Sequence, residues 1–490
     1  MSPKSSPAHK TQLRHPWTTA IGALLMLAVA NLWFYRQTLT NTFFGNDLYL
    51  VYGSMDLPSY LAAFGLDFQR AMRDAFRIYY YRPLFADIIR GLIGVFGLNF
   101  PLWHAVMLAV HIINSMLVFI LFRRYFSRRW LALGGAVFWS IGFYKADAVM
   151  WLACAHVYVS FICLMMLVLS PRLNGFTGIA ARAGMLGIAV LIHETAWPFA
   201  GVLVLEAWLA RRERIYRVAG LGFAIVALAI PFALLYRHIA STSLFPKSEF
   251  SIISSVQNYL PLLTALFVPF HLMQNKLNQW TALHGYPRIE WIHVLIPFWI
   301  AVGGLLWRVS RALPKLPKKL SQDRIMWWGI LWTMVLLVPG AQYEPWLHGR
   351  HAYMISVGLI LALGRAAEHW MDLSPQKKPS TLLISLASIL IATQLIFSIR
   401  VLSHMNRGYR EVPAMVADLK SREKPPLPGE TWVVEDFPFY EQEIMSFLRY
   451  DYGKSPAVMV FPGKAVKLPE GRLRRLRYDG ESVKLVKAGK

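Results

Sequence analysis

The chain has 490 residues, of which 56% are hydrophobic and only 16% are charged, and its mean hydropathy is +0.40. This composition is too apolar for soluble domains and indicates a polytopic membrane protein with lipid as its solvent. The formal charge of +24 lies largely in short loops between apolar runs, which favours a membrane topology signal over a nucleic-acid partner.

The apolar runs predict the membrane helices. The first run, residues 17–33, follows Lys4, Lys10 and Arg14; because it is long and lacks a small-residue cleavage site, we expect a retained first helix with a cytoplasmic N-terminus. The chain is therefore predicted to be an all-α polytopic membrane protein with about 11–13 membrane helices. The further predicted runs are 101–122, 130–143, 154–170, 183–192, 196–210, 218–236, 291–307, 326–338, 353–370 and 381–399.

Short loops rich in Lys and Arg mark the cytoplasmic face, because their translocation is costly. Three loops meet this test, and they contain Arg123, Arg124, Arg128 and Arg129; Arg211, Arg212, Arg214 and Arg217; and Arg308, Arg311, Lys315, Lys318, Lys319 and Arg324. Alternation then places a second set of loops together on the extracytoplasmic face. Their polar and aromatic residues are Asp47, Lys145, Asp147, Trp151, His193, Glu194, Glu344, Arg350 and His351.

Two segments do not fit simple alternation. If residues 252–272 crossed the bilayer, the basic loop at 308–324 would move outside, so we expect this segment to be interfacial or re-entrant. Residues 57–93 mix charges with apolar residues at helical spacing, as helices on the membrane surface do. They can form either a solvated amphipathic linker or a wall of a functional site.

The composition changes after Arg400. A Pro-rich break, KPPLPGE, precedes the strand-like run TWVVEDF, and a second strand-like run, AVMVF, follows a helix-like stretch at residues 439–450. The sequence predicts a membrane domain over 1–400 and a small extracytoplasmic α/β domain over 401–490. No short internal repeat is evident in this second domain.

Three polar side chains, those of His104, His111 and Asn114, share one stripe of the predicted helix at 101–122, because spacings of seven and three residues return to the same helical face. Polar groups so placed should face protein and not lipid. The two histidines could bind a metal or pack in the core. No third ligand occurs at a useful spacing, so packing is favoured and no metal site is predicted.

This stripe closes a longer stretch that resembles the start of the GT-C membrane glycosyltransferases. The resemblance is carried by a Tyr-Arg-Pro-Leu entry at Arg82, then Gly-Leu-Asn, then Trp-His and the His-x-x-Asn pair, in the run YYYRPLFADIIRGLIGVFGLNFPLWHAVMLAVHIIN. It is similar above all to the transmembrane and tetratricopeptide-repeat O-mannosyltransferases and their bacterial relatives. Met107 departs from their usual Asn, and the repeats are absent. The ordered motifs extend over residues 18–370.

The resemblance implies an inverting transfer of a sugar from a polyprenyl-phosphate donor to a glycan, lipid or protein acceptor, on the outer face of a bacterial inner membrane. In this family an acidic residue of the first outer loop is expected to act as the base, and Asp47 of FFGNDLYL matches it. Asp47 could instead form an Asx turn or helix cap. The run IHETAWP resembles the acidic turn of the family, which makes Glu194 the second catalytic candidate and His193 a site candidate.

The run HGRHAYMISVGLILALG resembles the Arg-Tyr-x-Tyr-x-Pro-x-x-Gly signature of a late helix. The resemblance implies that Arg350 and Tyr353 bind the donor phosphate, with Arg82 as the alternative ligand. Arg350 could instead snorkel to headgroups or neutralise Glu344. Lys145 is a further site candidate, whereas the Ala-Cys before His156 breaks the family pattern and favours a core histidine there. Some relatives need a divalent metal and others do not, and this sequence indicates neither.

Two other classes of function are compatible with a polytopic membrane protein. A transporter or flippase would place its binding groups near the bilayer midplane, often between two related halves, and no repeated halves are evident. A non-catalytic scaffold of GT-C type would fit the departures at Met107, Ala153 and Cys154.

Overall fold

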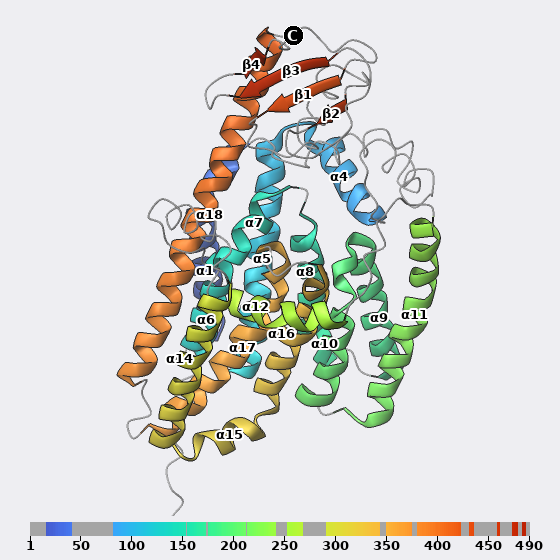
Figure 1. The fold of residues 1–490 in the computed structure, drawn as a ribbon. Helices are drawn as coiled ribbons and strands as arrows, with labels where there is room; N and C mark the ends of the chain where they lie inside the picture. Colours follow the sequence, from blue (N-terminus) through green and yellow to red (C-terminus); the bar gives the residue numbers. More distant parts are fainter. Residues whose placement is uncertain are drawn as a thin grey trace, which may run out of the picture.

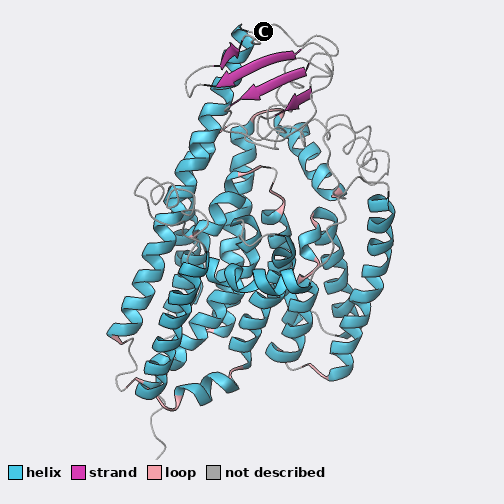
Figure 2. Cartoon of the chain, viewed as in Figure 1, coloured by secondary structure: helices cyan, strands magenta, loops and turns pink. Residues whose placement is uncertain are grey.

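The protein is mainly a bundle of helices with a small sheet at one end, as the computed structural model in Figures 1 and 2 shows. The structure describes residues 16–41, 82–152, 154–172, 175–211, 213–241, 252–267, 291–343, 349–374, 380–422, 431–435, 458–460, 473–478 and 483–486. Asp47 and Glu344, singled out from the sequence, lie outside these residues.

Each predicted apolar run falls on a helix. The α-helices are α1 (Pro16–Tyr35), α4 (Pro83–Phe96), α5 (Phe100–Tyr125), α6 (Arg129–Ile141), α7 (Phe143–Met150), α8 (His156–Leu169), α9 (Gly175–Ile192), α10 (Phe199–Leu205), α11 (Ile215–Ser241), α12 (Ile252–Ala265), α14 (Trp291–Ala312), α15 (Leu316–Gln322), α16 (Arg324–Tyr343), α17 (Gly349–Leu373) and α18 (Thr381–Arg422). Short 3-10 turns occupy η1 (Arg36–Thr40), η3 (Ser170–Arg172) and η4 (Glu194–Ala196), and a π-helical turn, η5 (Glu206–Ala210), extends α10.

Three helices of the described residues are long and apolar enough to cross a membrane, namely α5, α9 and the Thr381–Ser403 part of α18. Shorter apolar helical segments are His156–Leu169, Ile215–Pro231 and Arg324–Val338. These helices support the interpretation of the chain as an integral membrane protein.

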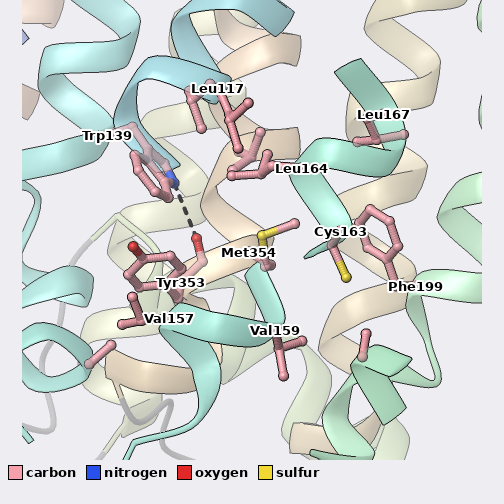
Figure 3. Packing of buried hydrophobic residues seen from close by; sticks show 14 of the residues in the cluster. Leu117, Trp139, Val157, Val159, Cys163, Leu164, Leu167, Phe199, Tyr353 and Met354 are labelled. Carbon is pink, nitrogen blue, oxygen red and sulfur yellow. Dashed lines mark hydrogen bonds between the residues drawn. The ribbon is translucent and has the colours of Figure 1, made fainter. Parts of the chain in front are cut away.

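The core forms where α5, α6, α8, α16 and α17 pack together. Its largest side chains include Trp103, Trp139, Trp328 and Trp332, all less than 2% exposed. The Trp139 Nε1–H donates to the carbonyl of Tyr353 at 3.1 Å, which joins α6 to α17 (Figure 3). Helices α16 and α17 approach so closely that a Cβ atom on Gly358 would lie 2.7 Å from the carbonyl oxygen of Gly329. Any larger side chain there would separate the two helices.

Helix α12 lies across the bundle instead of along it (Figure 1). Its 14 residues span about 21 Å at 1.5 Å per residue, which is shorter than a bilayer core. The Tyr259 hydroxyl donates to the carbonyl of Met334 and so fixes α12 against α16. The described part of the predicted 252–272 segment is therefore a short helix, as a non-spanning segment requires.

Helix α18 runs for 42 residues and crosses the predicted domain boundary at residue 400 without a break. It reaches the sheet at the top of Figure 1. The strands are β1 (Thr431–Glu435), β2 (Val458–Val460), β3 (Leu473–Tyr478) and β4 (Val483–Val486), in the spatial order β2-β1-β3-β4.

Strand β1 pairs in parallel with β2 and with β3, and β4 pairs antiparallel to β3. The two predicted strand-like runs are thus confirmed as β1 and β2, whereas β3 and β4 were not predicted. The predicted helix at 439–450 lies outside the described residues, so the α/β domain as a unit stays a prediction.

Candidate functional site

Four segments meet at the end of the bundle that faces the sheet. They are the N-cap of α4 at Arg82, the turn from α7 to α8, the loop after α9, and the first turn of α17. The contacts between them, given below, bring together Arg82, Asp147, Trp151, His156, His193, Glu194, Arg350 and His351. We call this set the end cluster. Of the outer-loop residues named from the sequence, it contains Asp147, Trp151, His193, Glu194, Arg350 and His351.

Arg82 and Glu194 form a two-point ion pair. The Nε–H of Arg82 donates to Oε2 of Glu194 at 2.8 Å, and Nη2 donates to Oε1 at 2.5 Å. Pro83 begins α4 and so holds Arg82 at its N-terminus. Burial raises the pKa of Glu194, but the charge and hydrogen bonds of Arg82 outweigh it and leave the pKa below its usual value. Glu194 is therefore an ionised carboxylate that orients Arg82.

Three imidazole rings of the end cluster lie close together. The ring of His156 lies 4.5 Å from that of His193 and 5.1 Å from that of His351, measured between centroids. The Thr195 hydroxyl lies 3.0 Å from His193 Nδ1 and 3.5 Å from His156 Nε2. Burial lowers the pKa of His193 well below its usual value, and the charges of Arg82, His351 and Arg350 lower it further. His193 is therefore neutral at physiological pH.

His156 is the buried, hydrogen-bonded histidine that the sequence favoured: it is 7% exposed and its Nδ1 lies 3.4 Å from Cys154 Sγ. Its ring also contacts that of His193, which places it in the end cluster. The sequence signal for this position is a histidine at the first residue of an apolar helix.

Arg350 stacks on an aromatic ring. Its Cζ lies 4.6 Å from the centre of the Trp151 ring, a cation–π contact. Its backbone N–H donates to Oδ2 of Asp147 at 3.3 Å, which fixes the first turn of α17. Within the described part of the chain the guanidinium group forms no ion pair. A guanidinium group is the kind of group that binds an anion through paired N–H donors.

The predicted stripe on α5 lies in the core, away from the end cluster. His111 Nδ1 lies 2.5 Å from the Tyr353 hydroxyl, and its Nε2 lies 3.0 Å from the carbonyl oxygen of Ser140. The Asn114 amide donates to the carbonyl of Val157 at 2.9 Å and to the Tyr353 hydroxyl at 3.3 Å. The stripe faces protein, as predicted, and its side chains join α5 to α6, α8 and α17.

Two other predicted site residues, Tyr353 and Lys145, are also buried among the helices, as is His104 of the stripe. The Tyr353 hydroxyl is engaged by His111 and Asn114 of the stripe. Lys145 is 1% exposed, donates from Nζ to the Ser356 hydroxyl at 2.6 Å, and lies 5.0 Å from the Trp139 ring centre.

No group of three or more His, Cys, Asp or Glu side chains within the described residues is arranged to hold a metal ion. In the end cluster the ring of His156 packs against those of His193 and His351. What the cluster offers chemically is two guanidinium groups, three imidazoles, of which that of His193 is neutral, and the carboxyl groups of Asp147 and Glu194.

Comparisons with known proteins gave only distant structural likeness. No protein-family model and no curated protein sequence matches the chain. A crystal structure of ArnT from Cupriavidus metallidurans bound to undecaprenyl phosphate is similar over 92% of this chain and 87% of its own, at 14% identity and a TM-score of 0.46.

A second structure, the oligosaccharyltransferase of Archaeoglobus fulgidus in complex with Zn and sulfate, is similar over 89% of this chain and 62% of its own, at 14% identity and a TM-score of 0.44. The similarity thus spans less than two thirds of that protein. At these TM-scores neither structure assigns a fold family or an activity to this chain.

Proposed function

We propose that this chain is an integral membrane glycosyltransferase that moves a sugar from a polyprenyl-phosphate donor to an acceptor, with inversion, at the end cluster. The observation that carries the proposal is that Arg82 and Arg350, from segments far apart in the sequence, both lie near His193, whose ring is one of three neighbouring imidazoles. The motif resemblance in the sequence supports it independently.

The chemistry of the leaving group explains the two arginines. When the glycosidic bond to the phosphate breaks, negative charge develops on the phosphate oxygens. A guanidinium group is always protonated and presents paired N–H donors that match phosphate geometry. Arg350 stacks on Trp151, and Arg82 is held in place by Glu194. Together they would bind the phosphate and stabilise the developing charge.

The Arg82–Glu194 pair suggests different roles for the carboxylates of Glu194 and Asp47. A general base must accept a proton, and Glu194 is a weak one because its pKa is lowered and both its oxygens are hydrogen-bonded. We therefore assign Glu194 to positioning Arg82. Asp47, outside the described residues, remains the proposed base that removes the proton of the acceptor hydroxyl.

The proposed membrane orientation places the end cluster and the sheet outside the cytoplasm. The predicted basic loops support it, because Arg124, in the last turn of α5, donates to the carbonyl groups of Leu167 and Val168, at the far end of α8 from His156. A reporter at residue 317 should be inaccessible from outside intact cells, and one at residue 453 accessible. The reverse result would contradict the orientation.

The proposal is tested by donor binding and by transfer. Purified protein should bind polyprenyl phosphate, and Arg350→Gln and Arg82→Gln should each weaken binding roughly tenfold or more, since each removes charge-assisted hydrogen bonds. Arg172→Gln, at an exposed arginine of η3, is the matched control and should bind as wild type does. In membranes, Asp47→Asn should reduce sugar transfer by about 10²-fold or more without loss of protein. Binding that is equal in all variants would disprove the phosphate site.

A further inference from the structure

An apolar groove runs along the outside of the bundle between α1, α6 and α18, on residues that the end cluster does not use. Its volume is about 400 Å³, within the range of roughly 300–1,000 Å³ found for ligand cavities. Apart from the Gln394 side chain, its lining is apolar or glycine. The residues of α6 and the adjoining turn that line it are Trp130, Leu133, Gly134, Val137, Phe138, Ile141 and Gly142.

Two neighbouring glycines of α6 define the groove. A Cβ atom on Gly135 would lie 3.2 Å from the Phe122 ring and 3.3 Å from Ile360, so this residue faces the packed bundle. A Cβ atom on Gly134 would meet nothing within 4 Å, so this residue faces open space. The α18 side of the groove is also open to the surroundings of the bundle, since the Ile391 side chain is 44% exposed. The groove can therefore take a ligand without moving a helix.

The groove lies at membrane depth, because its α18 wall falls within Thr381–Ser403, which is long and apolar enough to cross a bilayer. Trp130, which is 55% exposed, lines it next to the α5–α6 turn. Tryptophan at the end of a membrane helix favours the headgroup level. The preceding residue, Arg129, is exposed and belongs to the basic turn. An apolar trough beside a basic group suits an anionic lipid.

We propose that this groove binds one acyl chain of an anionic phospholipid whose phosphate lies at Arg129. The bound chain would fill the space between α6 and α18 and so brace α18, which leads to the sheet. This inference needs only the membrane location of the bundle and does not depend on the proposed transfer reaction. It therefore stands or falls separately from the phosphate site at Arg82 and Arg350.

The site is tested by photo-cross-linking to phosphatidylglycerol that carries a diazirine at the middle of one acyl chain. In purified wild type, labelled peptides should concentrate on the groove segments of α6 and α18. Gly134→Leu should reduce this labelling roughly tenfold, because the new side chain takes the place of several methylene groups of the lipid. Gly303→Leu is the matched control, since a Cβ atom there also meets nothing within 4 Å, but on α14.

The headgroup is tested separately. Arg129→Gln should abolish the preference for phosphatidylglycerol over phosphatidylcholine, whereas Arg308→Gln, at an exposed arginine of α14, should preserve it. If Gly134→Leu does not fold, as judged by its elution from size-exclusion chromatography, Arg129→Gln decides alone. Equal labelling of wild type and Gly134→Leu, no effect of Arg129→Gln, or displacement of the label by polyprenyl phosphate as effective as by phosphatidylglycerol would each overturn the proposal.

Discussion

The two ends of the bundle use arginine in different ways. At the end opposite the sheet, Arg365 donates to Asp323 at 2.9 Å, to Glu368 at 2.6 Å and to the carbonyl of Tyr125 at 3.1 Å. The two carboxylates are only 4% and 2% exposed. At the end cluster, Arg350 stacks on Trp151 and forms no ion pair within the described residues. A fully engaged cation fastens helices, whereas one with donors to spare can bind a ligand.

The largest expected effect is loss of the fastening arginine. Arg365→Ala would leave Glu368 buried without its cation and Asp323 with His369 as its remaining side-chain partner. Breaking a buried ion pair costs about 3–5 kcal/mol. We expect a large fall in the amount of folded protein, measured by size-exclusion chromatography after solubilisation. Arg324→Ala, at an exposed arginine of the same end, should express normally. A stable Arg365→Ala protein would remove the contrast between the two ends.

The binding arginine should behave in the opposite way. Arg350→Ala should leave the protein folded but reduce donor-dependent transfer roughly 10- to 100-fold, since each charge-assisted hydrogen bond contributes about 1.5–3 kcal/mol. Arg350→Lys keeps the charge but loses the paired donors, so its rate should lie between wild type and Arg350→Ala. The measurement is rate against donor concentration in purified protein. A Lys variant equal to wild type would indicate a snorkelling arginine and would leave Arg82 as the phosphate ligand.

The contrast between the ends also shows what the sequence could predict. Helical periodicity and the positions of basic loops were enough to predict which segments are helices and which polar loops meet, because both depend on local composition. The partners of each group were not predictable. Glu194 pairs with Arg82 across 112 positions of the chain, and no local pattern encodes such a contact.

The stripe on α5 illustrates the same limit. The helical spacing correctly predicted that His111 and Asn114 face protein, but it could not show whether they belong to the packed core or to a functional site. That difference rests on the carbonyl groups of Ser140 and Val157 and on the Tyr353 hydroxyl, which hydrogen-bond to these side chains. Tyr353 was expected near the phosphate for its place in a motif, and the structure buries it in the bundle, on the same helix as Arg350.

A smaller effect tests this distinction directly. Tyr353→Phe removes the hydroxyl that His111 and Asn114 share, and leaving a buried polar group unsatisfied costs about 1–3 kcal/mol. We expect a lower unfolding temperature with unchanged donor affinity. Tyr259→Phe removes the hydroxyl that bonds the carbonyl of Met334 and is a control for loss of the hydroxyl of a half-buried tyrosine elsewhere. Weaker donor binding in Tyr353→Phe alone would return this residue to the phosphate site.

The smallest expected effect is a pH dependence of stability at the end cluster. The folded-state pKa of His193 lies well below its usual value near 6.5, chiefly because of burial. Below pH 6.5 this histidine therefore binds a proton in the unfolded chain but not in the folded protein. The free energy of unfolding then falls as the pH is lowered, by about 1.4 kcal/mol per pH unit for one such group.

This pH dependence can be separated from that of the neighbouring carboxylate. The folded-state pKa of Glu194 lies below its unfolded value of 4.5, so its contribution persists above pH 4.5 and is lost only below it. Between pH 7 and pH 5 the histidine effect should therefore dominate, and His193→Gln should flatten the fall in unfolding temperature of the solubilised protein. Glu194→Gln should leave the slope over this range unchanged. An equal slope in wild type and His193→Gln would mean that the imidazole beside Arg82 and Arg350 is not held neutral by its surroundings.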